Sequence, residues 1–137
     1  MPSTTFRLAL LNYNFTWIGL NKVMDHKTVE AYVLSMPNAV LDYPFGEDVA
    51  VYKAKDKMFA LISEKSDPVR ISLKCDPQLA VLLREKYETV MPGYHLNKKH
   101  WNTVVLTGQL PWEEVQGLIR HSYDLVLGNK NAIPKMH

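Results

Sequence analysis

Cysteine is nearly absent from this 137-residue chain, in which Cys75 is the single thiol. One cysteine excludes an internal disulfide framework and an all-cysteine metal site. It also favours a reducing compartment, so we expect a cytoplasmic protein. The six glycines are scattered, so there is no phosphate-binding glycine loop, and no His-Glu-x-x-His or similar metal motif occurs. We therefore expect neither a metal nor a cofactor.

The sequence also lacks an excess of charge of either sign. It has 16 Lys and Arg residues against 14 Asp and Glu residues, a formal net charge of +2. Arg7 and Lys22 are the only charged residues in positions 1–23, so positions 24–137 are neutral. A neutral domain does not attract nucleic acid as a whole, and any such contact must come from a local basic patch.

No hydrophobic run is long enough to span a bilayer, which needs about 20 apolar residues. The most apolar stretch, residues 6–20, is interrupted by two Asn and one Thr, and no small-x-small cleavage site follows it. We expect residues 1–23 to be a poorly ordered extension outside the fold, residues 24–128 to form a single domain and 129–137 to be a tail. A signal or anchor, and an ordered extra element, are the alternatives for the extension. We expect no membrane partner.

What the chain does contain is a regular succession of helix and strand patterns. Asp25 precedes apolar residues in helical spacing that continue to about Met36, which indicates a first helix. Residues 49–53, 58–63 and 69–74 have the composition of strands. Their connections are too short for parallel crossovers, so they predict an antiparallel meander.

The sequence patterns after residue 75 predict the second half of the fold. Asp76 is a favourable N-cap and Pro77 is favoured at the first helical position, so together they predict a second helix. A strand near Tyr94 and another at 103–107 follow, and a last helix occupies residues 111–127. We therefore expect an α+β fold of two layers, with helices packed on an antiparallel sheet of about five strands, in the order α-β-β-β-α-β-(β)-α.

The segment 92–103, PGYHLNKKHWNT, combines aromatic, imidazole, amide and ammonium groups more densely than any other part of the chain. Ammonium groups contact phosphates, amides pair with base edges, and aromatic rings stack on bases or insert into a groove. The candidate nucleic-acid contacts are Tyr94, His95, Asn97, Lys98, Lys99, His100, Trp101 and Asn102, and Arg84 and Lys86 add charge upstream. One alternative is that Tyr94 and Trp101 anchor the core while the lysines are only solvated. Another is that a half-buried Trp101 holds the lysines outward.

Three further lysines, Lys53, Lys55 and Lys57, bracket the tip of the first predicted hairpin. A basic hairpin tip is suited to lie against a phosphate backbone as a wing. The alternative is a solvated turn whose lysines only oppose aggregation.

Catalytic groups are harder to find. Cys75 lies directly before a predicted helix start, where the helix dipole lowers the pKa of a thiol, and beside a histidine it would be a nucleophile. No spacing indicates such a partner, and the alternative is a small residue packed under the helix. Glu113 and Glu114 fall in the first turn of the last helix, where they complement the dipole without catalysis. We expect no catalytic residues and no enzymatic activity.

Five stretches resemble the MmcQ/YjbR family of small bacterial proteins. They are residues 42–46 (DYPFG), 57–62 (KMFALI), 71–77 (ISLKCDP), 92–104 (PGYHLNKKHWNTV) and 119–126 (IRHSYDLV), in the family's order. The resemblance covers about residues 24–128 and implies a two-layer fold of the secretion-chaperone-like or frataxin-like kind, often described as a double-wing DNA-binding module. The resemblance implies no set of catalytic residues. The positions that match its signature are Tyr94, His95, Asn97, Lys98, His100, Trp101 and Asn102, and Lys99 fits a basic position.

Three hypotheses follow from these observations. The leading one is a non-enzymatic protein that binds DNA through residues 98–101 and the hairpin tip. The second is a protein-interaction or chaperone-like module whose exposed sheet or aromatic patch binds a partner chain. The third is a small-molecule or enzymatic site built from His95, His100 and Cys75.

Overall fold

The computed structural model describes residues 24–129, so the expectations for residues 1–23 and for positions 130–137 lie outside the described part of the chain. Its helices and strands are, in chain order, α1 (His26–Leu34), β2 (Val40–Asp42), β3 (Val49–Ala54), β4 (Lys57–Ser63), β5 (Arg70–Lys74), α2 (Pro77–Lys86), β6 (Val90–Pro92), β7 (Trp101–Val105) and α3 (Trp112–Val126). None of these helices is both long and apolar enough to cross a membrane.

The strands form one antiparallel sheet in the order β2-β3-β4-β5-β7-β6. The expected α+β class and the antiparallel meander of β3, β4 and β5 are confirmed. The sheet has six strands where about five were expected, because Val40–Asp42 pairs with β3 at one edge. Three residues are too few to show an alternating pattern, so this strand has no signal in the sequence.

The two predicted N-caps are confirmed. Asp25 Oδ1 accepts a hydrogen bond from Thr28 N at 2.8 Å at the start of α1. Asp76 Oδ2 accepts hydrogen bonds from Gln78 N and Leu79 N, both at 3.1 Å, at the start of α2. Each carboxylate satisfies N–H groups that have no partner within the first turn, and its negative charge is favoured at that end of the helix dipole.

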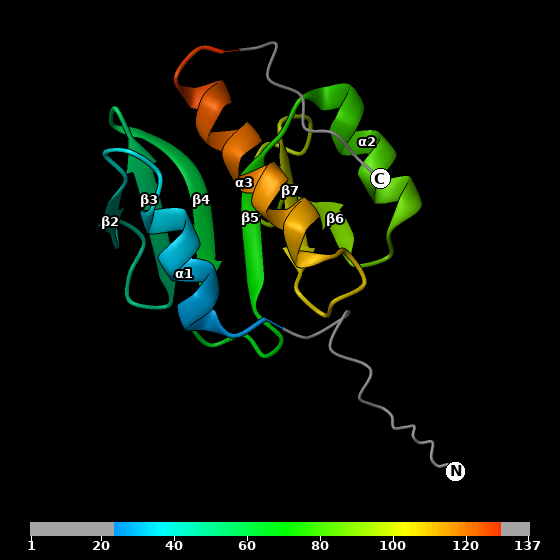
Figure 1. Ribbon diagram of the computed structural model, residues 1–137, viewed down its shortest axis with the longest axis horizontal. Helices are drawn as coiled ribbons and strands as arrows, with labels where there is room; N and C mark the ends of the chain where they lie inside the picture. Colours follow the sequence, from blue (N-terminus) through cyan, green and yellow to red (C-terminus); the bar gives the residue numbers. More distant parts are fainter. Residues whose placement is uncertain (1–23, 130–137) are drawn as a thin grey trace.

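The main hydrophobic core lies between the sheet and its helices. Helices α1 and α3 cover one face of the sheet, and α2 lies beside β6 and β7 (Figure 1). The largest fully buried side chains of this layer include Tyr52, Phe59, Ile62, Ile71 and Ile119. The rings of Phe59 and Tyr123 meet edge to face with their centroids 5.4 Å apart, a favourable geometry for aromatic pairs.

Two buried polar residues tie α3 to the rest of the core. Ser122 Oγ donates a hydrogen bond to Phe59 O at 2.5 Å and accepts one from Lys74 N at 2.9 Å, so it joins α3 to β4 and β5. His121 Nε2 accepts a hydrogen bond from Asp76 N at 3.0 Å, which requires that this nitrogen carries no proton. These bonds satisfy backbone groups that would otherwise lack a partner.

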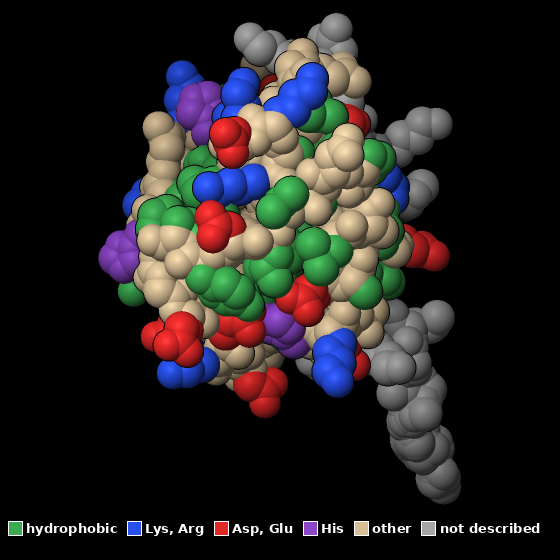
Figure 2. Space-filling model, turned by 90° about the vertical axis from the view of Figure 1, so that its left-hand side faces the viewer, with side chains coloured by type: hydrophobic (Ala, Val, Ile, Leu, Met, Phe, Trp, Pro, Cys, Tyr) green, Lys and Arg blue, Asp and Glu red, His purple; other side chains and the backbone are tan. Residues whose placement is uncertain are grey.

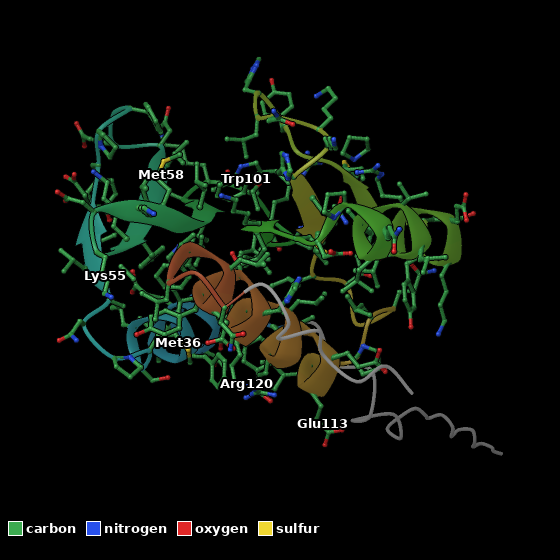
Figure 3. The ribbon with its side chains drawn as sticks, turned by 90° about the horizontal axis from the view of Figure 1, so that it is seen from above. Met36, Lys55, Met58, Trp101, Glu113 and Arg120 are labelled. Atoms are coloured by element: carbon green, nitrogen blue, oxygen red, sulfur yellow. The ribbon has the colours of Figure 1, made fainter. Side chains whose placement is uncertain are left out.

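The other face of the sheet, here called the open face, carries a smaller apolar cluster. Its buried members and the half-buried side chains around them are Val51, Leu61, Trp101, Val49, Met58 and Leu96. Figure 3 shows Trp101 and Met58 on this side of the sheet and Arg120 on the helical side. Gly93 lies against the cluster, since its N–H donates a hydrogen bond to Trp101 O at 2.9 Å.

We expect Gly93→Ala to lower the free energy of unfolding by about 1–3 kcal/mol, a typical cost of overpacking. The reason is steric, because a Cβ at Gly93 would lie 2.7 Å from Trp101 Cβ. Urea unfolding followed by circular dichroism measures the change. The control is Gly46→Ala, where a Cβ meets nothing within 4 Å and only the positive φ of +103° opposes the substitution. The control therefore measures backbone strain alone. A loss of less than about 0.5 kcal/mol at Gly93, the range of an ordinary surface substitution, would contradict the steric account.

We expect Ser122→Ala to destabilise the fold by about 1–3 kcal/mol, because the buried carbonyl of Phe59 and the partly buried N–H of Lys74 lose their partner. The control is Ser35→Ala. The exposed Ser35 hydroxyl donates a hydrogen bond to Tyr32 O and to no other residue in the range 24–129, so its loss should change stability by at most about 0.5 kcal/mol. Thermal unfolding compares the two variants. Equal losses would show that the Ser122 bridge does not hold α3 on the sheet.

Candidate functional site

Strand direction brings the two predicted basic segments to the same end of the sheet. Strands β4 and β7 each pair antiparallel with β5, so they run in the same direction and begin at the same end. The hairpin tip at 55–56 precedes β4, and the turn at 97–100 precedes β7. We call this the lysine end, and its lysines are Lys53, Lys55, Lys57, Lys74, Lys98 and Lys99.

The hairpin tip presents its lysines on a tight turn. Lys55 and Asp56 both have positive φ, 50° and 63°, and connect the paired residues Ala54 and Lys57. Positive φ at both central residues is typical of the turn whose twist matches that of the two strands it joins in a two-residue hairpin. The ammonium groups of Lys55 and Lys57 are exposed and have no hydrogen bond or ion pair within residues 24–129.

Two of the lysines already have partners. Lys53 Nζ lies 3.4 Å from Asp42 Oδ2 in an ion pair, and Lys98 Nζ donates a hydrogen bond to Gly93 O at 3.0 Å. Lys99 is exposed, and in the described part of the chain its ammonium group bonds no other residue. Lys74 is half-buried, so Lys55, Lys57 and Lys99 are the cations at this end that are most available to an anion.

The turn at 97–100 is held by its own backbone and by β5. Asn97 Oδ1 accepts a hydrogen bond from Lys99 N at 3.0 Å, and Asn97 O accepts one from His100 N at 3.2 Å. His100 O in turn accepts a hydrogen bond from Cys75 N at 2.8 Å. Asn97 thus shapes the turn that presents Lys99, and His100, half-buried, connects the turn to the end of β5.

Two of the predicted contact residues point into the protein. Trp101 is 8% exposed and packs in the open-face cluster. Asn102 is 3% exposed, and its Nδ2 donates a hydrogen bond to Ala80 O in α2 while its Oδ1 accepts one from Arg84 Nη1 at 2.8 Å. Arg84 Nη1 also donates to Lys98 O at 3.0 Å. Trp101 therefore packs in the fold, as the alternative of an aromatic core anchor expected. Asn102 and Arg84 hold the turn at 97–100 through hydrogen bonds.

Tyr94 and His95 lie over the open face instead of at the lysine end. Tyr94 is 70% exposed, its ring centroid lies 4.0 Å from that of His95, and His95 has a left-handed φ of 57°. Both line a groove of about 740 Å³, which we call the open-face groove. The segment 92–103 is thus divided between two surfaces. The sequence did not indicate the groove itself, because its other walls come from distant parts of the chain.

The charged side chains are unevenly distributed over the surface. In the view of Figure 2, Lys and Arg side chains gather toward the upper end, whereas Asp and Glu side chains predominate in the lower half. The net charge of the chain is close to zero, so the local basic character of the lysine end comes from this separation.

Cys75 does not have the properties of a nucleophile. Its side chain is 4% exposed. Burial, with a smaller contribution from the charge of Asp76, raises the pKa of the Cys75 thiol to about 12, so the thiol stays protonated near neutral pH. No group of three or more His, Cys, Asp or Glu side chains within residues 24–129 is arranged to hold a metal ion.

This α+β chain belongs to the YjbR family, since the family model of that description matches residues 34–125. The resemblance inferred from the five sequence stretches is thereby confirmed. The Escherichia coli O157:H7 protein YbdF is 36% identical over 108 residues, which are 79% of this chain and 88% of YbdF. YjbR of Escherichia coli strain K12 is 37% identical over 104 residues, which are 76% of this chain and 86% of YjbR.

Solved structures agree with the family assignment. The crystal structure of the Deinococcus radiodurans protein DR2400 is similar with a TM-score of 0.73 and 36% identity, over 82% of this chain and 84% of that one. A crystal structure of a Pseudomonas syringae protein has a TM-score of 0.64 and 34% identity, over 74% of this chain and 98% of that one. These comparisons establish family and fold, and the names of the relatives state no activity.

We expect Cys75 to react slowly with a disulfide reagent in the native protein and rapidly in denaturing urea, because the thiol is buried and protonated. A control protein with Cys75→Ser and Ser35→Cys carries its only thiol at an exposed position and should react rapidly without urea. Absorbance of the released thiolate follows both reactions. Equally rapid labelling of native Cys75 would restore it as a candidate nucleophile.

Proposed function

We propose that the protein is a non-enzymatic DNA-binding protein whose lysine end contacts the phosphate backbone. The observation that supports the proposal is the meeting of the β3-β4 hairpin tip and the turn at 97–100 at one end of the sheet. Three exposed ammonium groups lie there, those of Lys55, Lys57 and Lys99, and none of them bonds another residue of the described chain. In this proposal the hairpin and the turn act as two wings.

The geometry favours contact with phosphates over reading of bases. Lysine ammonium groups bind phosphate oxygens regardless of sequence. Trp101 and Asn102, the side chains best suited to stack on bases or pair with them, are buried in the fold. His100 is half-buried at the same end. Binding is therefore expected to be weak, sensitive to salt and nearly independent of DNA sequence.

The salt dependence gives a quantitative test. Each phosphate neutralised on a duplex contributes about −0.9 to the slope of log affinity against log salt concentration, so three lysines predict a slope of about −3. Fluorescence anisotropy with a labelled mixed-sequence duplex, started at low ionic strength, measures this slope. The triple substitution Lys55→Gln, Lys57→Gln and Lys99→Gln should remove most of the binding.

A matched control keeps the net charge the same in both variants. The substitutions Lys27→Gln, Lys65→Gln and Lys86→Gln remove three exposed lysines from α1, from the turn after β4 and from the end of α2. Lys86, expected from the sequence to add charge to the contact, leads into the start of β6, which lies at the opposite end of the sheet from the lysine end. This variant should bind with nearly the affinity and slope of the unaltered protein. Equal losses in the two variants would assign binding to net charge alone. Absence of binding at low salt, where attraction is strongest, would overturn the proposal.

A further inference from the structure

The open-face groove is a feature of the described fold that the proposed DNA contact does not use. It lies on the sheet face opposite α1 and α3, and its floor includes Leu61, Ser72 and Thr103. One wall is the segment of Tyr94 and His95, and the opposite wall includes Phe45 from the loop before β3. Its volume of about 740 Å³ falls in the range of roughly 300–1,000 Å³ that is usual for small-molecule sites.

The walls expose large apolar side chains to solvent. Phe45 is 63% exposed and Tyr94 is 70% exposed, although both border the groove. Apolar side chains gathered around a concave surface are typical of ligand sites, because a bound apolar group removes their area from water. The groove is therefore suited to the apolar body of a ligand.

The charged side chains that line the groove are both cationic. They are Arg70, at the start of β5, and Lys98, and no Asp or Glu of the described chain is among the lining residues. The Lys98 ammonium group donates a hydrogen bond to Gly93 O. The Arg70 guanidinium, in contrast, makes no hydrogen bond or ion pair within residues 24–129. A guanidinium beside an apolar surface is well suited to bind a carboxylate through two parallel hydrogen bonds.

The aromatic wall is fixed in place before any ligand arrives. Thr103 Oγ1 in the floor accepts a hydrogen bond from Tyr94 N at 3.1 Å and lies 2.7 Å from Ser72 Oγ, with which it shares a hydrogen bond. His95 follows in the left-handed conformation, which is uncommon outside glycine and concentrates at binding sites. A wall anchored to its floor in this way limits the entropy lost on binding.

From these observations we infer that the open-face groove binds a small carboxylate with an apolar body. Arg70 pairs with the carboxylate, the Tyr94 wall and Leu61 contact the body, and the floor hydroxyls of Ser72 and Thr103 lie beneath it. The inference is independent of the DNA proposal, because neither Arg70 nor the Tyr94 wall is part of the lysine end. Lys98 borders both surfaces, but its ammonium group is bonded to Gly93 O and neither proposal uses it. Either surface can therefore fail its test without affecting the other.

The test compares two probes of the same shape, naphthaleneacetate and the neutral naphthaleneacetamide, by isothermal titration calorimetry. A charge-assisted pair with Arg70 should make the carboxylate bind at least about tenfold more tightly than the amide. Arg70→Gln should abolish this preference, and Arg70→Lys should retain part of it, since an ammonium group keeps the charge without the paired donors. Arg70 is exposed, so both variants should keep their melting temperature.

The control variant is Arg120→Gln, which removes the same charge from the helical side of the sheet (Figure 3) and should leave the preference unchanged. Ser63→Trp places a large ring in the groove and should weaken the binding of both probes. This loss would show that the probes bind in the groove. Equal affinity for the two probes, retention of the preference in Arg70→Gln, or no binding of naphthaleneacetate at millimolar concentration would each overturn the inference.

Discussion

Both candidate surfaces depend on β7, whose side chains alternate between the two faces of the sheet. On the open face, Trp101 packs in one cluster with Leu96, which directly precedes the turn at 97–100, and Thr103 holds the backbone of Tyr94. On the helical face, Asn102 joins the strand to α2. One five-residue strand therefore positions the lysine end, the groove wall and a helix together. A shift of one residue in its pairing with β5 would exchange the two faces and disrupt all three.

The net charge of the chain and the distribution of its charges lead to different expectations for how the protein attracts DNA. Residues 24–137 carry equal numbers of cations and anions, and a neutral domain has little long-range attraction for DNA. Yet the strand directions collect lysines from two separate segments at one end. Because attraction between exposed charges falls off over about 10 Å at moderate salt, a phosphate near that end responds to those lysines far more than to the balance of the whole chain. The neutral net charge therefore limits long-range electrostatic attraction between the protein and DNA, but it does not prevent contact between the lysines and phosphates at short range.

The features that the sequence predicted correctly are those with local causes. Asp25 and Asp76 cap helices within three residues of themselves, and short connections force β3, β4 and β5 into an antiparallel meander. The site was less predictable, because burial depends on packing between distant segments. Trp101 and Asn102 carry groups suited to nucleic-acid contact, but α2 and the open-face cluster bury them. No pattern in the sequence marks Arg70, since Arg70 and the aromatic wall line one groove only after β5 and β7 have paired.

Both edge strands of the sheet, β2 and β6, are only three residues long. A long flat edge presents a row of unpaired N–H and C=O groups on which a strand of another chain can build. Here β6 ends in Pro92, which has no N–H, and the ion pair of Asp42 and Lys53 borders β2. The sheet therefore has little edge on which to grow. The protein can leave one apolar face of its sheet uncovered without offering the hydrogen-bonding template through which uncovered sheets polymerise.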